Sequence, residues 1–484
     1  MTEYETVIGL ECHVELSTRT KMFCGCVNEF GAPPNTNVCP VCLGHPGTLP
    51  VPNETAIEYI VKIGLALGCG IAPRSLFHRK NYFYPDMPKN FQISQYDLPV
   101  CVAGHIDIEV DGETRRIGIT RVHMEEDTGK TTHAGATGRI AQADYALLDY
   151  NRAGVPLVEI VSEPDIRSPE EAAAYLREIR ATVEALGVSD VRMEEGSLRC
   201  DANISLRPTG SDELGVKVEI KNLNSIRSLE RALTYEEERQ AAALAAGEPL
   251  VQETRHWDED QGSTLTLRSK EEAFDYRYFP EPDLPPLEPD RGWVESIRAS
   301  LPELPAALRA RFDKDYRLKP AQALILAGSR EWADFFVETV KLGAAPAAAA
   351  NWMTQDVAGN LNKAKLELRD APITPQHLAD IVRLVEDDTI SLTGAKQVLE
   401  EVLASGADVE KVVEDKGLRQ VSDTTALAAL IDEVIAENPD PVDQVRKGKD
   451  GAIGFLVGQV IKKSGGSANP KVAQELLRER LSGS

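Results

Sequence analysis

The chain has 484 residues, of which 77 are acidic and 53 are basic, so its formal net charge is -24. This length is sufficient for two to four domains with well-buried cores. The charge argues against bulk attraction to nucleic acid, although it does not exclude a local basic surface. No apolar run of about 18 residues occurs and the start MTEYETV is unlike a targeting peptide, so we expect a cytoplasmic protein without membrane contact.

The first predicted strand, VIGLECHVEL, separates its apolar residues from its polar ones. Successive side chains of a strand point to opposite faces, so Glu11, His13 and Glu15 share one face. The other face is apolar and carries Ile8, Leu10, Cys12 and Val14. Two carboxylates and an imidazole in one row suit a bound cation, because burying them unpaired is costly. The alternative is an edge strand with a solvated polar face.

Four cysteines follow with the spacing C-x-C-x12-C-x2-C. They are Cys24, Cys26, Cys39 and Cys42. Two close pairs separated by a loop are typical of structural zinc sites, in which four thiolates complete a tetrahedral shell. The alternatives are two disulfides or four ordinary buried thiols. Disulfides fit poorly, since no secretory signal precedes the motif. We therefore predict a structural zinc ion.

The stretch RKNYFYPDMPKNFQISQYD mixes basic and aromatic side chains. Arg79 and Lys80 stand close to Tyr82 and Tyr84. Cations beside aromatic rings can pair with phosphates and stack on a base. An aromatic core flanked by surface lysines would give the same pattern, so both interpretations stay open here.

Two later segments place acidic residues in or after apolar strands. The stretch IGITRVHMEEDTGK carries Glu125, Glu126 and Asp127, and Glu159 interrupts the apolar stretch LVEIVSEPD. A surface turn and the polar side of an edge strand would also explain them. Together with the first strand, these segments predict a Mg²⁺-type site.

The order of elements predicts an α+β protein. Residues 1–294 mix short strands with a few helices, and one helix is predicted from a Ser168 cap to Gly187. Polar positions in the last strands of this part include Glu194, Asp201 and Lys217, which suit a polar cavity or a solvated sheet face. A proline-rich segment, 280–293, cannot be regular structure and marks a boundary.

The rest of the chain reads as helical, with a middle domain over residues 295–405 and a tail domain over 406–484. The tail has basic residues although the chain is acidic, among them Lys447, Lys449, Lys462 and Lys463. Contact with nucleic acid and a lysine-rich solvated face explain this stretch equally well.

Taken together, these residues resemble a known family. VIGLECHVEL, RKNYFYPDMPKNFQISQYD, GITRVHMEEDTGK, NRAGVPLVEIVSEPDI, MEEGSLRCDANISLRP, VEIKNLNS, DYRYFPEPDLPPL and GFLVGQVIKKSGGSANP occur in the same order as in GatB, the B subunit of tRNA-dependent amidotransferases. The resemblance runs from Val7 to about Leu481. It implies a cradle domain, a helical domain and a small helical tail domain. Family members differ in whether they keep the four cysteines, and the complete set here favours Zn²⁺.

The resemblance implies a reaction. An amidase-type A subunit releases ammonia from glutamine, a C subunit completes the complex, and the B subunit uses ATP to phosphorylate the side-chain carboxylate of Glu-tRNA(Gln) or Asp-tRNA(Asn). Ammonia then displaces phosphate and leaves the amide. Neither a membrane nor DNA is an expected partner. Without its A subunit the chain would not use glutamine, although added ammonia could replace it.

The resemblance also implies roles for single residues. It assigns the metal and catalytic roles to Glu11, His13, Glu126 and Glu159, with Glu125 in reserve. Nucleotide or 3′-adenosine binding is expected of Arg79, Lys80, Tyr82 and Tyr84. The lining of the ammonia path is expected to include Glu194, Asp201 and Lys217, and tRNA binding is expected of Lys447, Lys449, Lys462 and Lys463.

Two competing functions remain at this point. One is a non-catalytic tRNA-binding or scaffold component of the same complex, in which the acidic strands only support the fold. The other is a stand-alone metal-dependent hydrolase that acts on a small substrate without tRNA.

Overall fold

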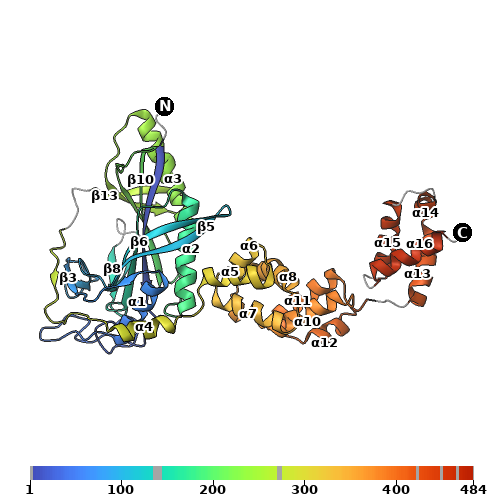
Figure 1. Ribbon diagram of the computed structural model, residues 1–484, viewed down its shortest axis with the longest axis horizontal. Coiled ribbons are helices and arrows are strands. Elements are labelled where there is room, and N and C mark those ends of the chain that lie inside the picture. Colours follow the sequence, from blue (N-terminus) through green and yellow to red (C-terminus); the bar gives the residue numbers. More distant parts are fainter. Residues whose placement is uncertain are drawn as a thin grey trace. The chain divides into compact units, whose positions relative to one another are not determined.

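The computed structural model describes residues 4–134, 144–269, 275–420, 424–446, 451–464 and 468–482. The chain divides into two compact units, Met1–Ala307 and Leu308–Ser484. The first unit combines strands with helices and the second is helical, which confirms the predicted α+β class (Figure 1). Within the described ranges, no helix is long and apolar enough to cross a membrane.

The first unit is built on a nine-stranded sheet in the order β13-β12-β11-β10-β1-β9-β6-β5-β2. Its strands are β1 (Tyr4–Glu15), β2 (Gly70–Ile71), β5 (Cys101–Val110), β6 (Glu113–Glu126), β9 (Pro156–Ser162), β10 (Leu198–Pro208), β11 (Val218–Lys221), β12 (Glu253–Asp258) and β13 (Ser263–Ser269). Two small sheets accompany it. They are formed by β14 (Phe279–Pro280), β3 (His78–Asn81) and β4 (Phe91–Ser94), and by β7 (Lys130–Ala134) and β8 (Tyr145–Asp149).

Helices pack against one face of the large sheet (Figure 1). They are α1 (Glu54–Ala66), α2 (Pro169–Leu186) and α3 (Ile226–Ala246). The caps explain their bounds: the Ser168 side chain accepts a hydrogen bond from the Glu171 amide, and Gly187 ends α2 with φ 67°. The predicted helix from Ser168 to Gly187 is therefore confirmed.

The alternation predicted for β1 is confirmed. Its four apolar side chains, Ile8, Leu10, Cys12 and Val14, are all buried in the core of the first unit. Glu11, His13 and Glu15 are only partly buried and lie on the other face. This polar face meets the next strands in register, because His13 pairs with Glu159 of β9 and Glu11 pairs with Asp201 of β10.

Strand β6 contains a bulge that changes which residues face the core. Between Ile119 and Arg121 the pairing with β9 shifts by one residue, so Thr120 is extra. An extra residue reverses the alternation downstream. The buried apolar positions accordingly move from Ile117 and Ile119 to Val122 and Met124.

The first unit extends past the proline-rich segment. Residues 281–290 contain no helix or strand, and α4 (Arg291–Ala299) follows them. Val294 and Ile297 of α4 are buried in the same core as β1. Burial of this apolar pair explains why the compact unit ends at Ala307, beyond the predicted boundary at residue 294.

The second unit has two hydrophobic cores. One includes buried residues from Leu308 to Val413 and the other from Leu427 to Leu481. Helices of the first core are α5 (Pro305–Tyr316), α6 (Pro320–Leu326), α7 (Arg330–Lys341), α8 (Pro346–Asn351), the π-helix Trp352–Val357, α9 (Ala358–Ala364), the 3₁₀ turn Leu368–Asp370, α10 (Pro375–Glu386), α11 (Leu392–Ser405) and α12 (Val409–Asp415). Helices of the second are α13 (Thr424–Glu437), α14 (Pro439–Arg446), α15 (Gly451–Lys463) and α16 (Pro470–Ser482).

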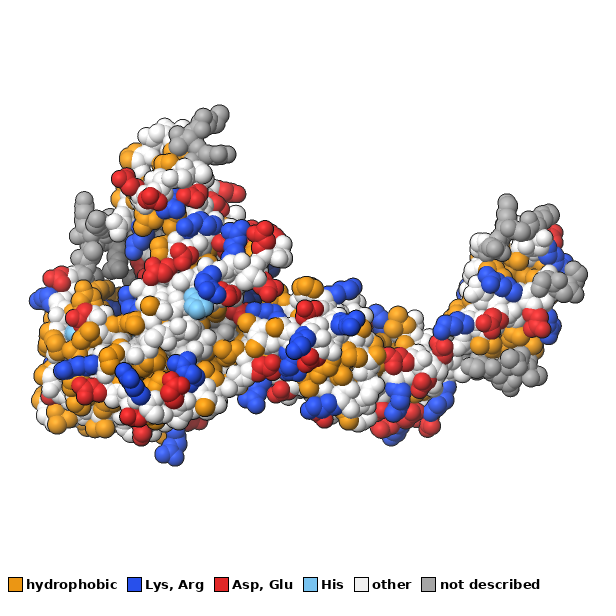
Figure 2. All heavy atoms as spheres, in the orientation of Figure 1, with side chains coloured by type: hydrophobic (Ala, Val, Ile, Leu, Met, Phe, Trp, Pro, Cys, Tyr) orange, Lys and Arg blue, Asp and Glu red, His pale blue; other side chains and the backbone are white. Residues whose placement is uncertain are grey.

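Charged side chains of both signs are interspersed over the face seen in Figure 2. Hydrophobic side chains gather on the first unit at the lower left of that view, where Figure 1 draws β3 and the loops before α1. Exposed hydrophobic residues of the loops before α1 are Val27, Phe30, Leu49 and Val51, and Phe83 and Tyr84 follow β3. The net acidity is therefore not concentrated on this face.

Candidate functional site

A cavity of about 390 Å³ opens on the polar face of β1. We call it the acidic cavity. Its lining comes from β1, β3, β6, β9, β10 and β11 and from two loops: Glu11, His13, Lys80, Gln95, Tyr96, Arg121, His123, Glu125, Glu159, Asp201, Glu219, Lys221, Tyr276 and Tyr278. Strands that are distant in sequence thus contribute their polar faces to one site.

Three residues on the floor of this cavity could hold a metal ion. One ligand atom each of His13, Glu125 and Glu159 lies within 4.8 Å of the others. His13 Nε2 is 3.4 Å from Glu159 Oε2. Glu125 and Glu159 are both buried, so their charges require a positive partner.

Neighbouring charges keep these carboxylates ionised. Burial raises the pKa of Glu125, but the Lys80 ammonium and His123 outweigh it and hold that pKa below its usual range. Burial likewise raises the pKa of Glu159, and His123 and His13 bring it below its usual value. Lys80 Nζ lies 3.9 Å from Glu125 Oε1. The carboxylates therefore offer oxygen atoms with negative charge to a cation.

His123 lies behind the cluster, buried between its two carboxylates. Its Nε2 is 3.6 Å from Glu125 Oε1 and 3.4 Å from Glu159 Oε2. Arg121 Nε donates to His123 Nδ1 at 3.4 Å, so Nδ1 is the accepting nitrogen. Nε2 then carries a proton that points to both carboxylates. His123 is therefore placed to orient both carboxylates.

The opposite wall carries a second group of charges. Lys221 Nζ lies 2.5 Å from Asp201 Oδ2 and 3.0 Å from Glu219 Oε1. Glu11 accepts a hydrogen bond from Asn203 Nδ2 at 2.9 Å. Burial and the nearby Glu159 raise the pKa of Glu11. The cavity therefore has a lysine on each side of its carboxylates.

A second cavity, of about 300 Å³, lies on the other side of β3 and β6. We call it the knuckle cavity, because Cys24 and Cys42 of the predicted zinc site, a zinc knuckle, help to line it. On each of these two strands, neighbouring residues point into different cavities. Lys80 and Glu125 line the acidic cavity, whereas Arg79 and Glu126 line the knuckle cavity. The strand alternation of side chains produces this division.

The structure does not bring Glu126 to the predicted metal cluster. Its carboxylate accepts hydrogen bonds from Lys89 and from the Ile93 amide. Because Glu125 is next to it in an extended strand, only one of the two can face His13. The residue held in reserve, Glu125, is the one that does.

Arg79 is also engaged away from the acidic cavity. Its guanidinium makes two hydrogen bonds to Glu281, of 2.7 and 2.8 Å, and a third to Asp283. The Glu281 side chain is only 1% exposed. A buried carboxylate depends on its counter-ion, so Arg79 joins β3 to the segment after β14.

We expect Arg79→Met to destabilise the first unit by about 3 kcal/mol, because it leaves the Glu281 carboxylate buried without a partner. Calorimetric unfolding of the chain measures the change. The double variant Arg79→Met/Glu281→Leu removes both charges and is expected to recover most of the loss. Unchanged unfolding of Arg79→Met, with weaker ATP binding, would instead support the nucleotide-binding role expected from the sequence.

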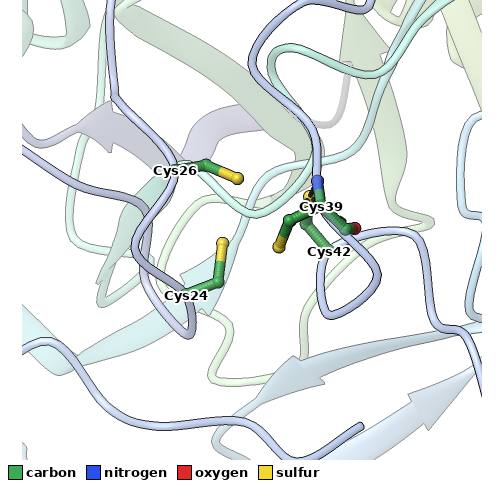
Figure 3. A group of neighbouring side chains, drawn as sticks. All are labelled: Cys24, Cys26, Cys39 and Cys42. Atoms are coloured by element: carbon green, nitrogen blue, oxygen red, sulfur yellow. Dashed lines mark hydrogen bonds between the residues drawn. The ribbon is translucent and has the colours of Figure 1, made fainter.

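The four cysteine sulfurs of the predicted zinc site converge (Figure 3). All four lie within 4.8 Å of one another, and Cys39 Sγ is 3.9 Å from Cys42 Sγ. Tetrahedral zinc with bonds of about 2.3 Å separates its sulfurs by about 3.8 Å. The fully buried Lys21 places Nζ 3.8 Å from Cys42 Sγ. The hydrogen bond from Cys24, with this ammonium nearby, lowers the pKa of Cys42 to about 4.

Hydrogen bonds join the loop between the cysteine pairs to strand β8 and to the residue that follows it. Asn35, at φ 59°, donates from its amide to Asp149 Oδ1 and from its side chain to the Leu148 carbonyl. The Tyr150 amide donates in turn to Asn35 Oδ1 at 2.8 Å. Residues 19–52, the knuckle segment, contain no helix or named strand, so these bonds and the cysteine cluster fix its shape.

The other predicted site residues are scattered. Tyr82 is half-buried and packs edge to face on Tyr276, while Tyr84 is exposed. Of the three residues expected to line the ammonia path, Asp201 lines the acidic cavity, and Glu194 and Lys217 are exposed and line neither of the two cavities.

The expected tRNA-binding lysines lie in or near α15. Lys462 is exposed at the end of this helix. Lys463 makes ion pairs of 2.8 and 2.7 Å with Glu433 and Glu437. Lys447 and Lys449 lie outside the described residues.

Sequence reasoning missed several residues of the acidic cavity. His123, Gln95, Tyr276 and Tyr278 have no functional assignment from the sequence, whereas Tyr96 belongs to the basic and aromatic stretch and Lys221 to a strand with polar positions that suit a cavity. In β6 the apolar residues change from odd to even positions, ending with Val122 and Met124. This change is visible in the sequence and puts His123 and Glu125 on the polar face. The pairing of β14 with β3 had no comparable signal, since about 200 residues separate them.

Comparisons with known proteins agree over both units. The family described as "GatB/GatE catalytic domain" matches residues 6–295, and the family described as "GatB domain" matches residues 334–481. Similar proteins are named as the B subunit of an aspartyl/glutamyl-tRNA(Asn/Gln) amidotransferase. That of Carboxydothermus hydrogenoformans is 54% identical over 99% of both chains. That of Brevibacillus brevis is 52% identical over 99% of both, and that of Thermosynechococcus vestitus is 54% identical over 99% of this chain and 96% of its own.

Proposed function

The chain belongs to the GatB family of aspartyl/glutamyl-tRNA(Asn/Gln) amidotransferase B subunits, and on that premise we propose that the acidic cavity is its kinase and amidation centre. As a member of this family it is part of an ATP-dependent ligase that forms Gln-tRNA(Gln) or Asn-tRNA(Asn) from the misacylated tRNA. The observation that carries the proposal is the cluster of the half-buried His13 with the buried Glu125 and Glu159 at the floor of the cavity.

Magnesium fits these residues. Two ionised, buried carboxylates and an imidazole within 4.8 Å of one another form a donor set that suits a cation, and Glu11 stands beside it on β1. We propose that His13, Glu125, Glu159 and Glu11 hold Mg²⁺. When bound, it supplies positive charge that neutralises the phosphates of ATP.

The side chains of the cavity then position the reacting groups. The γ-phosphoryl group of ATP passes to the side-chain carboxylate of the tRNA-bound amino acid, which makes that oxygen a good leaving group. Ammonia attacks the carbonyl carbon, the bond from that carbon to the phosphate oxygen breaks, and one proton of ammonia ends on the released phosphate. Lys80 and Lys221 flank the cluster, and we assign to them the stabilisation of the transferred phosphoryl group.

We propose that this chain works with two protein partners and a tRNA. An A subunit would supply ammonia from glutamine and a C subunit would complete the complex, which agrees with the relatives being named as one subunit of several. Asp201 is proposed to meet the arriving ammonia. We propose that the tail binds tRNA through Lys462 and its neighbours Lys447, Lys449 and Lys463, and that the cysteine cluster holds structural Zn²⁺.

A direct test measures ATP hydrolysis by the complex assembled with its A and C partners. The proposal expects hydrolysis only when Glu-tRNA(Gln) or Asp-tRNA(Asn) is present. A protein that is only a scaffold would bind the tRNA with no contribution from its acidic cavity. A stand-alone hydrolase would act on a small substrate without tRNA.

We expect His123→Ala to weaken Mg²⁺ binding by about 10- to 100-fold, because the two carboxylates lose the imidazole that orients them. Mn²⁺ titration followed by electron paramagnetic resonance measures this without any turnover. His123→Gln keeps a side-chain N–H donor and is expected to bind Mn²⁺ more tightly than His123→Ala. Equal weakening in both variants would point to a ligand role for the imidazole.

A further inference from the structure

One wall of the acidic cavity consists of three tyrosines that have no role so far. Tyr96 follows β4, and Tyr276 and Tyr278 precede β14. The rings of Tyr96 and Tyr278 stack with centroids 4.4 Å apart and planes 11° from parallel. Tyr276 meets Tyr278 edge to face at 6.2 Å. We call this group the tyrosine wall.

Contacts with neighbouring side chains hold the wall in place. The His78 ring packs edge to face on Tyr96 at 6.3 Å, and His78 Nε2 lies 3.1 Å from Asp97 Oδ1. Lys80 Nζ is 5.2 Å from the centre of the Tyr276 ring. A side chain held in this way loses little further entropy when a ligand binds to it.

The wall nevertheless presents ring surface to the solvent. Tyr96 is 58% exposed, although Tyr278 covers one face of its ring. Burial raises the pKa of Tyr278 to about 12, so this phenol stays neutral. A stacked pair of rings of which one is more than half exposed is a platform for another flat ring.

The surroundings indicate which flat ring. The same cavity holds a cation-binding cluster and two lysines, so the ligand also carries phosphate or a reacting carboxylate close to its ring. Both substrates of the proposed reaction join an adenine to such a reactive group. In ATP it is the base of the nucleotide, and in the charged tRNA it belongs to the 3′-terminal adenosine to which the amino acid is attached. We propose that the tyrosine wall stacks an adenine ring and so positions the attached reactive group over His13, Glu125 and Glu159. This inference rests on the proposed function.

The test uses Tyr96→Leu, Tyr96→Phe and Tyr96→Trp in the complex with A and C partners. One arm measures the KM for ATP. The other compares the Kd of tRNA with a complete 3′ end and of the same tRNA without its terminal adenosine. We expect Tyr96→Leu to weaken one of these by about tenfold, while Tyr96→Phe stays within about twofold and Tyr96→Trp binds at least as tightly as the wild type.

The two arms distinguish the source of the adenine. A raised KM for ATP assigns the wall to the nucleotide, and lost discrimination between the complete and truncated tRNA assigns it to the terminal adenosine. Unchanged values for both ligands in Tyr96→Leu overturn the proposal, and so does binding by Tyr96→Trp that is as weak as that of Tyr96→Leu. Failure of the proposed function is separate, because wild type and Tyr96→Phe would then lack tRNA-dependent ATP hydrolysis.

Discussion

Replacing Glu159 with glutamine is expected to lower tRNA-dependent ATP hydrolysis by the assembled complex about a thousandfold. Glu159 is the carboxylate that contacts both His13 and His123, so its charge is central to the cluster. A cation at the transferred phosphoryl group contributes several kcal/mol, and about 4 kcal/mol corresponds to three decades of rate. Glutamine keeps the shape of the side chain, so the fold is retained. The measurement is release of phosphate from γ-labelled ATP with Glu-tRNA(Gln).

The matched control is Glu126→Gln, which changes an acidic residue at the end of β6 that lies in the knuckle cavity. We expect it to retain most of the tRNA-dependent ATP hydrolysis, because its partners are Lys89 and the Ile93 amide. Both variants should bind tRNA like the wild type. The metal assignment would be wrong if Glu126→Gln lost hydrolysis while Glu159→Gln kept it.

Removing the metal from the cysteine cluster is expected to destabilise the first unit by about 4 kcal/mol or more, as loss of a structural metal does elsewhere. The knuckle segment has no helix or named strand to hold it, and its large buried residues beside the cluster are the consecutive Lys21, Met22 and Phe23. For a unit of this size the melting temperature would fall by roughly 6 °C or more. Scanning calorimetry before and after treatment with a zinc chelator measures the shift.

The variant Cys26→Ser separates metal loss from other effects of the chelator. It is expected to contain less than one equivalent of zinc and to melt at the temperature of the chelated wild type. The chelator should then change it no further. A wild type that contains no zinc when purified, yet melts as before after chelation, would leave the four sulfurs as ordinary thiols.

The sequence predicted the parts of the site that lie within one segment. The row of Glu11 and His13 follows from the period of a strand, the cysteine spacing follows from zinc coordination, and the α2 caps follow from the chemistry of Ser168 and Gly187. These patterns lie within one segment, and patterns of that kind usually agree with the folded structure.

Predictions that depended on pairing distant segments were incomplete. Whether Glu125 or Glu126 faces His13 depends on the bulge in β6, and whether Arg79 or Lys80 faces the cavity depends on how β3 pairs with β14. The tyrosine wall likewise joins residues about 180 positions apart. A pattern within one strand fixes the alternation of side chains, but tertiary pairing decides which face becomes the cavity.

The bulge at Thr120 has a consequence for how this site can change. Deleting that one residue would straighten β6 without exchanging its faces, because Arg121 to Glu126 keep their partners on β9 and Glu125 stays opposite Leu157. If Thr120 instead took a regular place in the ladder, every side chain downstream would turn over, so that Glu126 would enter the acidic cavity and Glu125 would leave it. The role of each carboxylate therefore rests on one residue that the ladder leaves out, and one residue can be lost at this point of the strand without exchanging the two cavities.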